Sequence, residues 1–260
     1  MTQRPYQRDL IAQWKREEQQ PFSGWDFSYL HSRMTEEQPP WSYTNRVIEL
    51  MRQSSAVLDM GTGGGEQLLD LREHWPARVV ATEDYPPNVK LAAERLTPPG
   101  AQVIKADVTD DGLLPLPDGA FDLVINRHSA FNAREVARVL APGGTFLTQQ
   151  VHGLWAEDLH AAFGTAPLYP NATPQQYVPR LQAAGMKIVH VEEWAGMFTF
   201  ADIGALVYYL KAMPWVVPNF SVDTYVDNLM RLQAQLERGE KLAFTDRKYI
   251  IEAQKLDEKA

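Results

Sequence analysis

The stretch Val57-Leu58-Asp59-Met60-Gly61-Thr62-Gly63-Gly64-Gly65-Glu66 joins an apolar run to a turn in which four of five residues are glycine. An amphipathic segment follows it. The glycines at positions 61, 63 and 65 permit positive φ angles and let a ligand approach backbone that carries no Cβ. A strand that enters a glycine-rich turn and then a helix is typical of the ligand-binding loops of α/β proteins. The stretch therefore predicts a ligand-cradling loop after a buried strand.

The same loop argues against a phosphate-rich ligand. A dinucleotide-binding fingerprint that starts at Gly61 requires Gly or Ala at the position that Glu66 occupies. An acidic side chain there would lie where a helix N-terminus otherwise receives pyrophosphate. The sequence also contains no G-x-x-x-x-G-K-[ST] pattern.

Around this loop, residues 54–150 alternate short apolar runs with amphipathic stretches, which predicts an α/β fold with a doubly wound sheet. We expect seven strands, mostly parallel, with the last strand antiparallel. The predicted strands are Ala56–Met60, Arg78–Glu83, Gln102–Ala106, Phe121–Asn126, Thr145–Gln150, Lys187–Glu192 and Lys248–Gln254. The predicted helices include Glu66–Trp75, Pro86–Leu96, Asn132–Leu140 and Thr173–Ala184.

Three parts follow from this pattern, within one structural unit. Residues 1–53 form a helical N-terminal arm or lid, residues 54–196 with 241–260 form the core, and residues 197–240 form a helical cap inserted between strands six and seven. Six of the seven tryptophans fall in residues 1–53, 151–172 and 194–241, outside the strands and helices of the predicted core. These aromatic residues either wall an acceptor site or pack a helical subdomain, and the sequence favours neither reading.

Further motifs follow the glycine loop in a fixed order. They are Val79–Glu83 with Asp84-Tyr85-Pro86-Pro87, Lys105–Val108, Leu116–Val124 and Val139–Phe146. With the loop, these motifs resemble those of class I S-adenosylmethionine-dependent methyltransferases, in particular the UbiE-like type 11 group. The resemblance covers residues 54–150 and implies a Rossmann-like core.

The resemblance implies S-adenosylmethionine as the cofactor and S-adenosylhomocysteine as its product. Glu83 is expected to accept hydrogen bonds from the ribose hydroxyls, with Asp84 as the alternative, and Asp84 or Tyr85 is expected to lie beside the adenine. The acid of the third motif, Asp107, is expected to receive the adenine amino group. The implied cofactor-binding residues are Asp59, Gly61, Gly63, Gly65, Glu83, Asp84, Tyr85, Asp107, Val108 and Asn126.

The catalytic signal is weaker. Methyl transfer is an in-line displacement that depends on alignment of the reactants, so a base is optional. His128 and His152 each follow a core strand, where a neutral imidazole could accept a proton. The alternative is that each is a structural histidine that caps a helix or bonds a backbone group. After Asn126 the Asn/Asp-Pro-Pro-aromatic motif is absent, which argues against methylation of adenine N6 or of glutamine.

Aromatic residues are the candidates for acceptor binding. Trp41 and Tyr43 precede the first core helix as a predicted flap, and Tyr208 and Trp215 lie in the predicted cap. The predicted acceptor is a small, partly apolar metabolite that is methylated on O, N or C. The alternatives are an RNA-base methyltransferase and a cofactor-binding module without catalytic activity.

Amino-acid composition and net charge limit the kinds of ligand and partner that the protein is expected to bind. The 260 residues include no Cys, and 25 Lys and Arg stand against 33 Asp and Glu, for a net charge of −8. This balance disfavours nucleic acid as a partner. The six histidines show no metal-ligand spacing, so no metal site is expected. Without a signal peptide or a membrane-length apolar run, a cytoplasmic protein is expected. The oligomeric state stays open.

Overall fold

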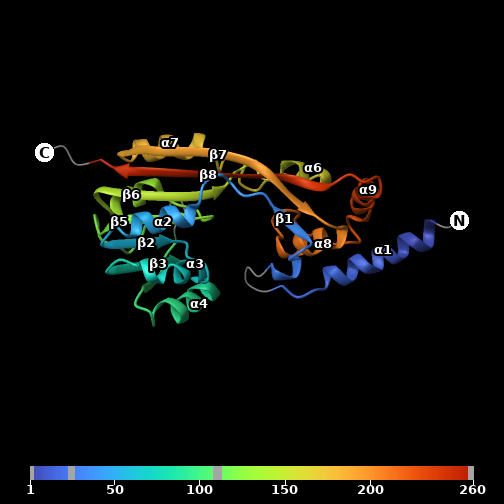
Figure 1. Ribbon diagram of the computed structural model, residues 1–260, viewed down its shortest axis with the longest axis horizontal. Coiled ribbons are helices and arrows are strands. Elements are labelled where there is room, and N and C mark those ends of the chain that lie inside the picture. Colours follow the sequence, from blue (N-terminus) through green and yellow to red (C-terminus); the bar gives the residue numbers. More distant parts are fainter. Residues whose placement is uncertain (1–2, 23–26, 108–112, 257–260) are drawn as a thin grey trace. The chain divides into compact units, whose positions relative to one another are not determined.

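The computed structural model describes residues 3–22, 27–107 and 113–256 and has an α/β fold (Figure 1). Its eight-stranded sheet has the order β1-β7-β8-β6-β5-β2-β3-β4. The strands are β1 Met34–Glu36, β2 Ala56–Met60, β3 Arg78–Glu83, β4 Gln102–Lys105, β5 Phe121–Arg127, β6 Leu140–Val151, β7 Met186–Phe200 and β8 Leu242–Lys255. The α-helices are α1 Gln3–Glu18, α2 Tyr43–Met51, α3 Glu66–Asp70, α4 Pro86–Leu96, α5 Ala133–Val139, α6 Glu157–Phe163, α7 Pro174–Ala183, α8 Ile203–Ala212 and α9 Val226–Glu237.

The predicted fold class is confirmed, and the predicted strand number is wrong by one. Strands β2 to β6 pair in parallel, and β8 runs antiparallel to β6. The additional strand, β1, lies in the predicted helical N-terminal arm. It pairs antiparallel with residues 198–200 of β7. Its three residues are exposed or partly exposed, so no apolar pattern marks it in the sequence.

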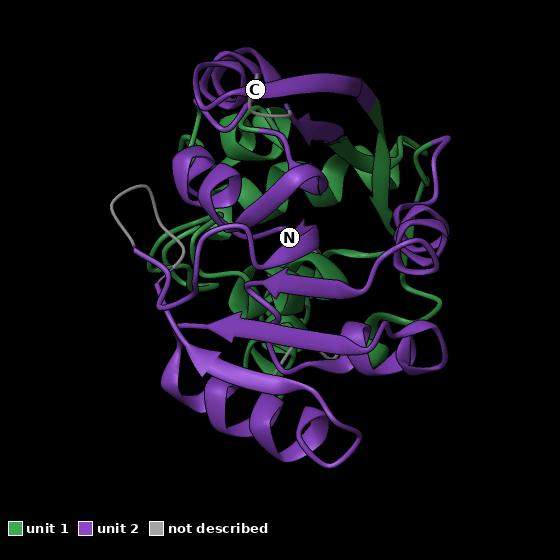
Figure 2. Cartoon of the chain, turned by 90° about the vertical axis from the view of Figure 1, so that its left-hand side faces the viewer, with its two compact units in different colours: residues 1–39, 153–170, 195–247 green, residues 40–152, 171–194, 248–260 purple. Residues whose placement is uncertain are grey.

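The chain divides into two compact units (Figure 2). Unit 1 comprises residues 1–39, 153–170 and 195–247, and unit 2 comprises residues 40–152, 171–194 and 248–260. Strands β7 and β8 continue through both units, which is why both are longer than predicted.

In unit 2, alternate strand residues enter two different hydrophobic cores. Leu58 and Val80 belong to the core that α5 and α7 cover, while Val57 and Val79 belong to the core that α2, α3 and α4 cover. This alternation follows from the twofold side-chain period of a strand that is buried on both faces. The parallel arrangement brings the carboxyl ends of β2, β3, β5 and β6 to one edge of the sheet.

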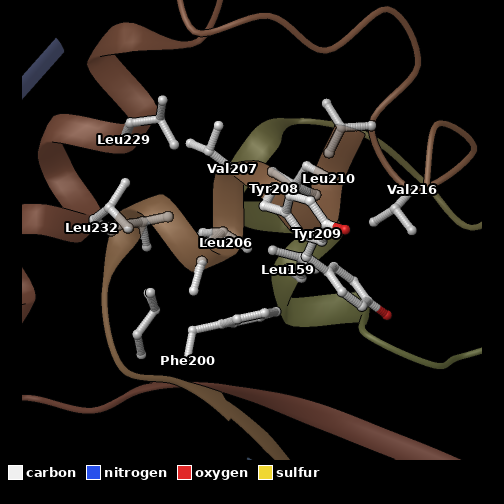
Figure 3. Packing of buried hydrophobic residues seen from close by; sticks show 14 of the residues in the cluster. Leu159, Phe200, Leu206, Val207, Tyr208, Tyr209, Leu210, Val216, Leu229 and Leu232 are labelled. Carbon is white, nitrogen blue, oxygen red and sulfur yellow. The ribbon is translucent and has the colours of Figure 1, made fainter. Parts of the chain in front are cut away.

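Unit 1 is built around α8, which is apolar on almost every side. Nine of the ten residues of Ile203–Ala212 are buried, and Asp202 caps the helix by accepting a hydrogen bond from the Ala205 N–H. Figure 3 shows side chains of α8, including Leu206 and Tyr209, among those of α6, α9 and β7. Burial on all sides is what a helix of this composition requires. In the described part of the chain, no helix combines the length and apolar character needed to cross a bilayer.

Candidate functional site

The glycine loop follows β2 at the carboxyl edge of the sheet in unit 2. Gly61, Gly63 and Gly65 have φ angles of +72°, +62° and +83°, which side chains with a Cβ rarely adopt. A Cβ on Gly61 would collide with the Ser129 side chain, whereas a Cβ on Gly63 would meet nothing within 4 Å. The loop therefore presents open backbone at Gly63.

Glu83 ends β3 beside this loop and is only 6% exposed. Its Oε2 accepts a hydrogen bond from the Gly63 N–H at 2.7 Å. Its Oε1 accepts hydrogen bonds from the Asp84 and Tyr85 N–H groups at 3.1 and 3.0 Å. The side chains of Asp84 and Tyr85 are exposed. Of the two adjacent acids, Glu83 is the one whose carboxylate faces the loop.

A second acid, Asp59, lies in β2 at the start of the loop. Desolvation, together with the negative charge of Glu83, raises the pKa of Asp59 to about 6, although the Thr62 hydroxyl opposes the shift. The next acid, Glu66, pairs with Arg95, which also donates to the Gly64 carbonyl. Because Glu66 is neutralised by Arg95, the carboxylates of Asp59 and Glu83 remain beside the loop. They favour a cationic ligand and disfavour a phosphate.

A buried polar network fixes the loop to the neighbouring strands. The Asn126 side chain at the end of β5 donates to the Met60 carbonyl at 3.0 Å. Its Oδ1 accepts hydrogen bonds from Thr148 at 2.9 Å and from Gln150 at 2.5 Å. Gln150 also donates to the Ser129 carbonyl at 2.8 Å. A buried polar group lowers the stability of the fold unless it is hydrogen-bonded. This network therefore holds the glycine loop and the turn at Ser129 in place.

The two candidate histidines have different surroundings. His128 has a φ of +55°, and its Nε2 lies 3.3 Å from the Gln149 side-chain nitrogen. His128 keeps part of its surface exposed, but the protein packed around its ring, with the positive charges of Arg127 and Lys248, lowers its pKa well below 6.5. His152 is buried, and its Nε2 lies 3.2 Å from a Glu193 carboxylate oxygen.

The two residues of the predicted flap lie in the same unit as the loop. The Trp41 indole N–H donates to the Gln149 side-chain oxygen at 2.8 Å. Tyr43 is buried at the start of α2, and the Arg127 guanidinium lies 5.8 Å from its ring centroid. Burial and the nearby negative charge of Asp59 raise the pKa of the Tyr43 hydroxyl. Unit 2 thus contains the loop, both histidines, the predicted flap and the predicted acids Asp59, Glu83, Asp84 and Asp107.

Asp107 also belongs to unit 2 and is exposed just after β4, and Val108 lies outside the described residues. Tyr208 and Trp215 belong to unit 1, where Tyr208 is buried in the aromatic core and Trp215 is 42% exposed. Within residues 3–22, 27–107 and 113–256, no group of three or more His, Asp or Glu side chains could hold a metal ion.

The sequence interpretation missed Thr148 and Tyr249. Thr148 belongs to the Asn126 network, and the ring of the fully buried Tyr249 meets that of His152 edge-on, with centroids 6.1 Å apart. The run Thr148-Gln149-Gln150 at the end of an apolar strand was the available signal for the network. Tyr249 carried none, because an aromatic residue in a strand is ordinarily part of the core.

Part of the chain is similar to known methyltransferases. A protein family described as a methyltransferase domain matches residues 58–148. A release factor glutamine methyltransferase of Mycolicibacterium smegmatis is 38% identical over 81 residues, 31% of this chain and 29% of that protein. A demethylmenaquinone methyltransferase of Thermus thermophilus is 36% identical over 117 residues, 39% of this chain and 50% of that protein.

A 23S rRNA (guanine(748)-N(1))-methyltransferase of Streptomyces fradiae is 31% identical over 135 residues, 50% of this chain and 47% of that protein. The chain thus spans half or less of the length of these three relatives. The crystal structure of a Bacillus halodurans protein superposes with a TM-score of 0.59 at 16% identity, covering 82% of this chain and 97% of that one. That likeness shows a shared fold.

Proposed function

We propose that this protein transfers a methyl group to a small, partly apolar metabolite. The chain contains a class I S-adenosylmethionine-dependent methyltransferase domain at residues 58–148. The Glu83 carboxylate beside the open backbone of Gly63 supports the choice of cofactor. A carboxylate can accept hydrogen bonds from two adjacent hydroxyls, as a ribose presents them.

The residues of unit 2 fit this cofactor. Glu83 would hold the ribose, and the backbone at Gly61 and Gly63 would lie against the methionine part. The charge of Asp59 suits a ligand that carries an ammonium and a sulfonium group. When bound, S-adenosylmethionine supplies an electrophilic methyl group. The exposed ring of Tyr85 and the carboxylate of Asp107 would lie toward the adenine.

A thermal-shift measurement tests the choice of cofactor. S-adenosylmethionine and S-adenosylhomocysteine should raise the melting temperature, because a ligand that binds the native state stabilises it by mass action. NAD and ATP should not. Stabilisation by NAD alone would refute the assignment.

The acceptor class is tested with cofactor that carries a tritiated methyl group. Label should enter the small-molecule fraction of a cell extract rather than RNA or protein. An RNA-base methyltransferase is the second candidate, favoured by the rRNA-methylating relative and opposed by the net charge of −8. Label in RNA would establish that candidate. Cofactor binding with no label in any fraction would indicate a non-catalytic module.

A further inference from the structure

Three side chains in unit 2 form a hydrogen-bonded relay that ends on His128. The Trp41 Nε1 lies 2.8 Å from Gln149 Oε1, and Gln149 Nε2 lies 3.3 Å from His128 Nε2. Trp41 stands 108 residues from Gln149 in the sequence. Gln149 is buried, so its amide has few other partners to choose from.

The relay determines which nitrogen of His128 carries the proton. An indole nitrogen can only donate, so the oxygen of the Gln149 amide must face Trp41. The NH₂ group of Gln149 then faces His128 and can only donate to it. The Nε2 of His128 must therefore be the acceptor, and a neutral ring carries its proton on Nδ1.

A backbone hydrogen bond also holds His128 next to Gln149. Its N–H donates to the Gln149 carbonyl at 2.9 Å, and its positive φ turns the chain sharply at the end of β5. Among the described residues, Gln149 is the side-chain hydrogen-bond partner of the ring, at Nε2, and none bonds Nδ1. The positive groups that act on the ring are Arg127 and Lys248. The Nδ1–H is therefore a donor in a positively charged environment.

We propose that His128 serves the site as a neutral hydrogen-bond donor through Nδ1–H rather than as a general base, with Trp41 and Gln149 as positioning residues that fix its tautomer. Given the proposed function, the donor specifies the substrate class. The acceptor carries an anionic oxygen, such as a carboxylate, enolate or phenolate, which the Nδ1–H and the positive charges can bind.

This chemistry needs no base. The methyl carbon exchanges its bond to sulfur for a bond to the oxygen of the acceptor. The lone pair of that oxygen forms the new bond, and the electron pair of the broken bond stays on sulfur. A sulfonium and an oxyanion thereby become a neutral thioether and a neutral ether or ester, and no proton is released. The hydrogen bond from His128 would bind and orient the acceptor.

Nitrogen NMR of ¹⁵N-histidine-labelled protein tests the tautomer without any substrate. At pH 7 the His128 resonances should show a protonated Nδ1 and an unprotonated Nε2. In Gln149→Glu both side-chain oxygens accept, so the proton should move to Nε2 and the pKa of His128 should rise by about 1–3 units. Gln67→Glu is the matched control, because Gln67 contacts Arg127 rather than His128, and it should leave the tautomer unchanged.

Two results would overturn the assignment: a wild-type ring protonated at Nε2, or a Gln149→Glu variant whose tautomer stays the same. Trp41→Phe sharpens the test. Without the indole donor the Gln149 amide is free to rotate, so both His128 tautomers should become detectable. A single unchanged tautomer in Trp41→Phe would exclude Trp41 from the relay.

Tritium transfer into the small-molecule fraction separates a donor from a base. An Asn side chain offers an N–H near the place of Nδ1–H and tolerates a positive φ, but it cannot act as a base. His128→Asn should transfer at least about tenfold more label than His128→Leu, the effect of a hydrogen bond to a charged group. If both variants lose methyl transfer to the same extent, the interpretation of His128 as a general base would be favoured instead. Failure of S-adenosylhomocysteine to bind would refute the proposed function and leave the tautomer result standing.

Discussion

In unit 2, polar side chains are buried at the ends of strands, whereas the centre of unit 1 is a continuous apolar and aromatic cluster. The buried polar residues at the ends of β3, β5 and β6 are Thr82, Glu83, Asn126, Thr148, Gln149 and Gln150. Unit 1 instead stacks rings, such as Trp155 on Phe198 with centroids 5.3 Å apart. A buried polar group is stable only with specific partners, while apolar packing tolerates many combinations.

This difference between the units accords with the position of the family match, which lies in unit 2. Residues 58–148 lie wholly in unit 2 and contain the loop whose geometry depends on particular residues, such as Gly61 against Ser129. Most core positions of unit 1 need only side chains of suitable volume. We therefore expect stability to be most sensitive in unit 1 and ligand binding to be most sensitive in unit 2.

The largest effect on stability is expected for Leu206→Ala in unit 1. Leu206 is fully buried in α8, and truncation of a buried Leu to Ala costs about 2–5 kcal/mol through lost burial and the cavity left behind. Urea denaturation should show this loss in the free energy of unfolding, and calorimetry should show an unchanged cofactor affinity in the folded protein. An affinity that falls in parallel would contradict the separation of roles. Val189→Ala, at an exposed position in unit 2, is the control for both measurements.

The largest effect on binding is expected for Glu83→Ala. Removal of the carboxylate would take away an ionised acceptor from the ribose hydroxyls, and it also leaves the Gly63 N–H without its partner. Charged hydrogen bonds contribute about 1.5–3 kcal/mol, which corresponds to a ten- to hundredfold loss of affinity. Calorimetric titration with S-adenosylhomocysteine measures this loss. Asp84→Ala is the matched control, since that side chain is exposed, and weaker binding in the control alone would move the ribose contact to Asp84.

A smaller effect concerns the pH dependence contributed by Asp59. Its pKa is raised to about 6 from the ordinary 3.8, so the native state binds this proton more tightly than the unfolded chain does. The ionised carboxylate therefore destabilises the native state above pH 6, and this cost disappears as the pH falls toward 4. Asp59→Asn should raise the free energy of unfolding by about 1–3 kcal/mol at pH 8 and by almost nothing at pH 4. Urea titrations at the two pH values measure the difference, and a variant less stable than wild type at pH 8 would contradict it.

Where local pattern and tertiary context agree, the sequence predicts elements to the residue. Strands Ala56–Met60 and Arg78–Glu83 and helix Pro86–Leu96 occur with the predicted bounds. The predicted helix Glu66–Trp75 instead divides into α3 and a 3₁₀ helix, Arg72–His74. Strand β7 continues beyond Glu192 through a charged and glycine-containing stretch, and β1 gives its residues 198–200 a partner from the arm. Such pairing joins distant segments, and no local pattern reveals it.

At the candidate site, too, the sequence reveals local motifs but not contacts between distant segments. The glycine loop and Glu83 are visible in the sequence because their spacing along one strand–turn–helix unit is fixed. The relay from Trp41 to His128 is not visible, because its members meet only after α2, β5 and β6 have assembled. The sequence could nominate His128 as a base, but only the partners of its ring indicate which nitrogen holds the proton.

The smallest effect on stability is expected for Trp215→Ala, which tests whether unit 1 does more than pack. Trp215 is 42% exposed, unlike the buried Tyr208, so its truncation should lower the free energy of unfolding by about 1 kcal/mol, less than that of Leu206. If residues 197–240 form the proposed acceptor cap, the variant should raise the KM for the acceptor or lower kcat, once an acceptor is known from the tritium assay. Its cofactor affinity should change by less than about threefold, because the proposed cofactor contacts lie in unit 2. Acceptor kinetics identical to wild type would refute the role of Trp215 in the cap and favour the reading in which the aromatic residues of unit 1 only build its core. A loss of cofactor affinity as large as that of Glu83→Ala would instead refute the division of binding between the two units.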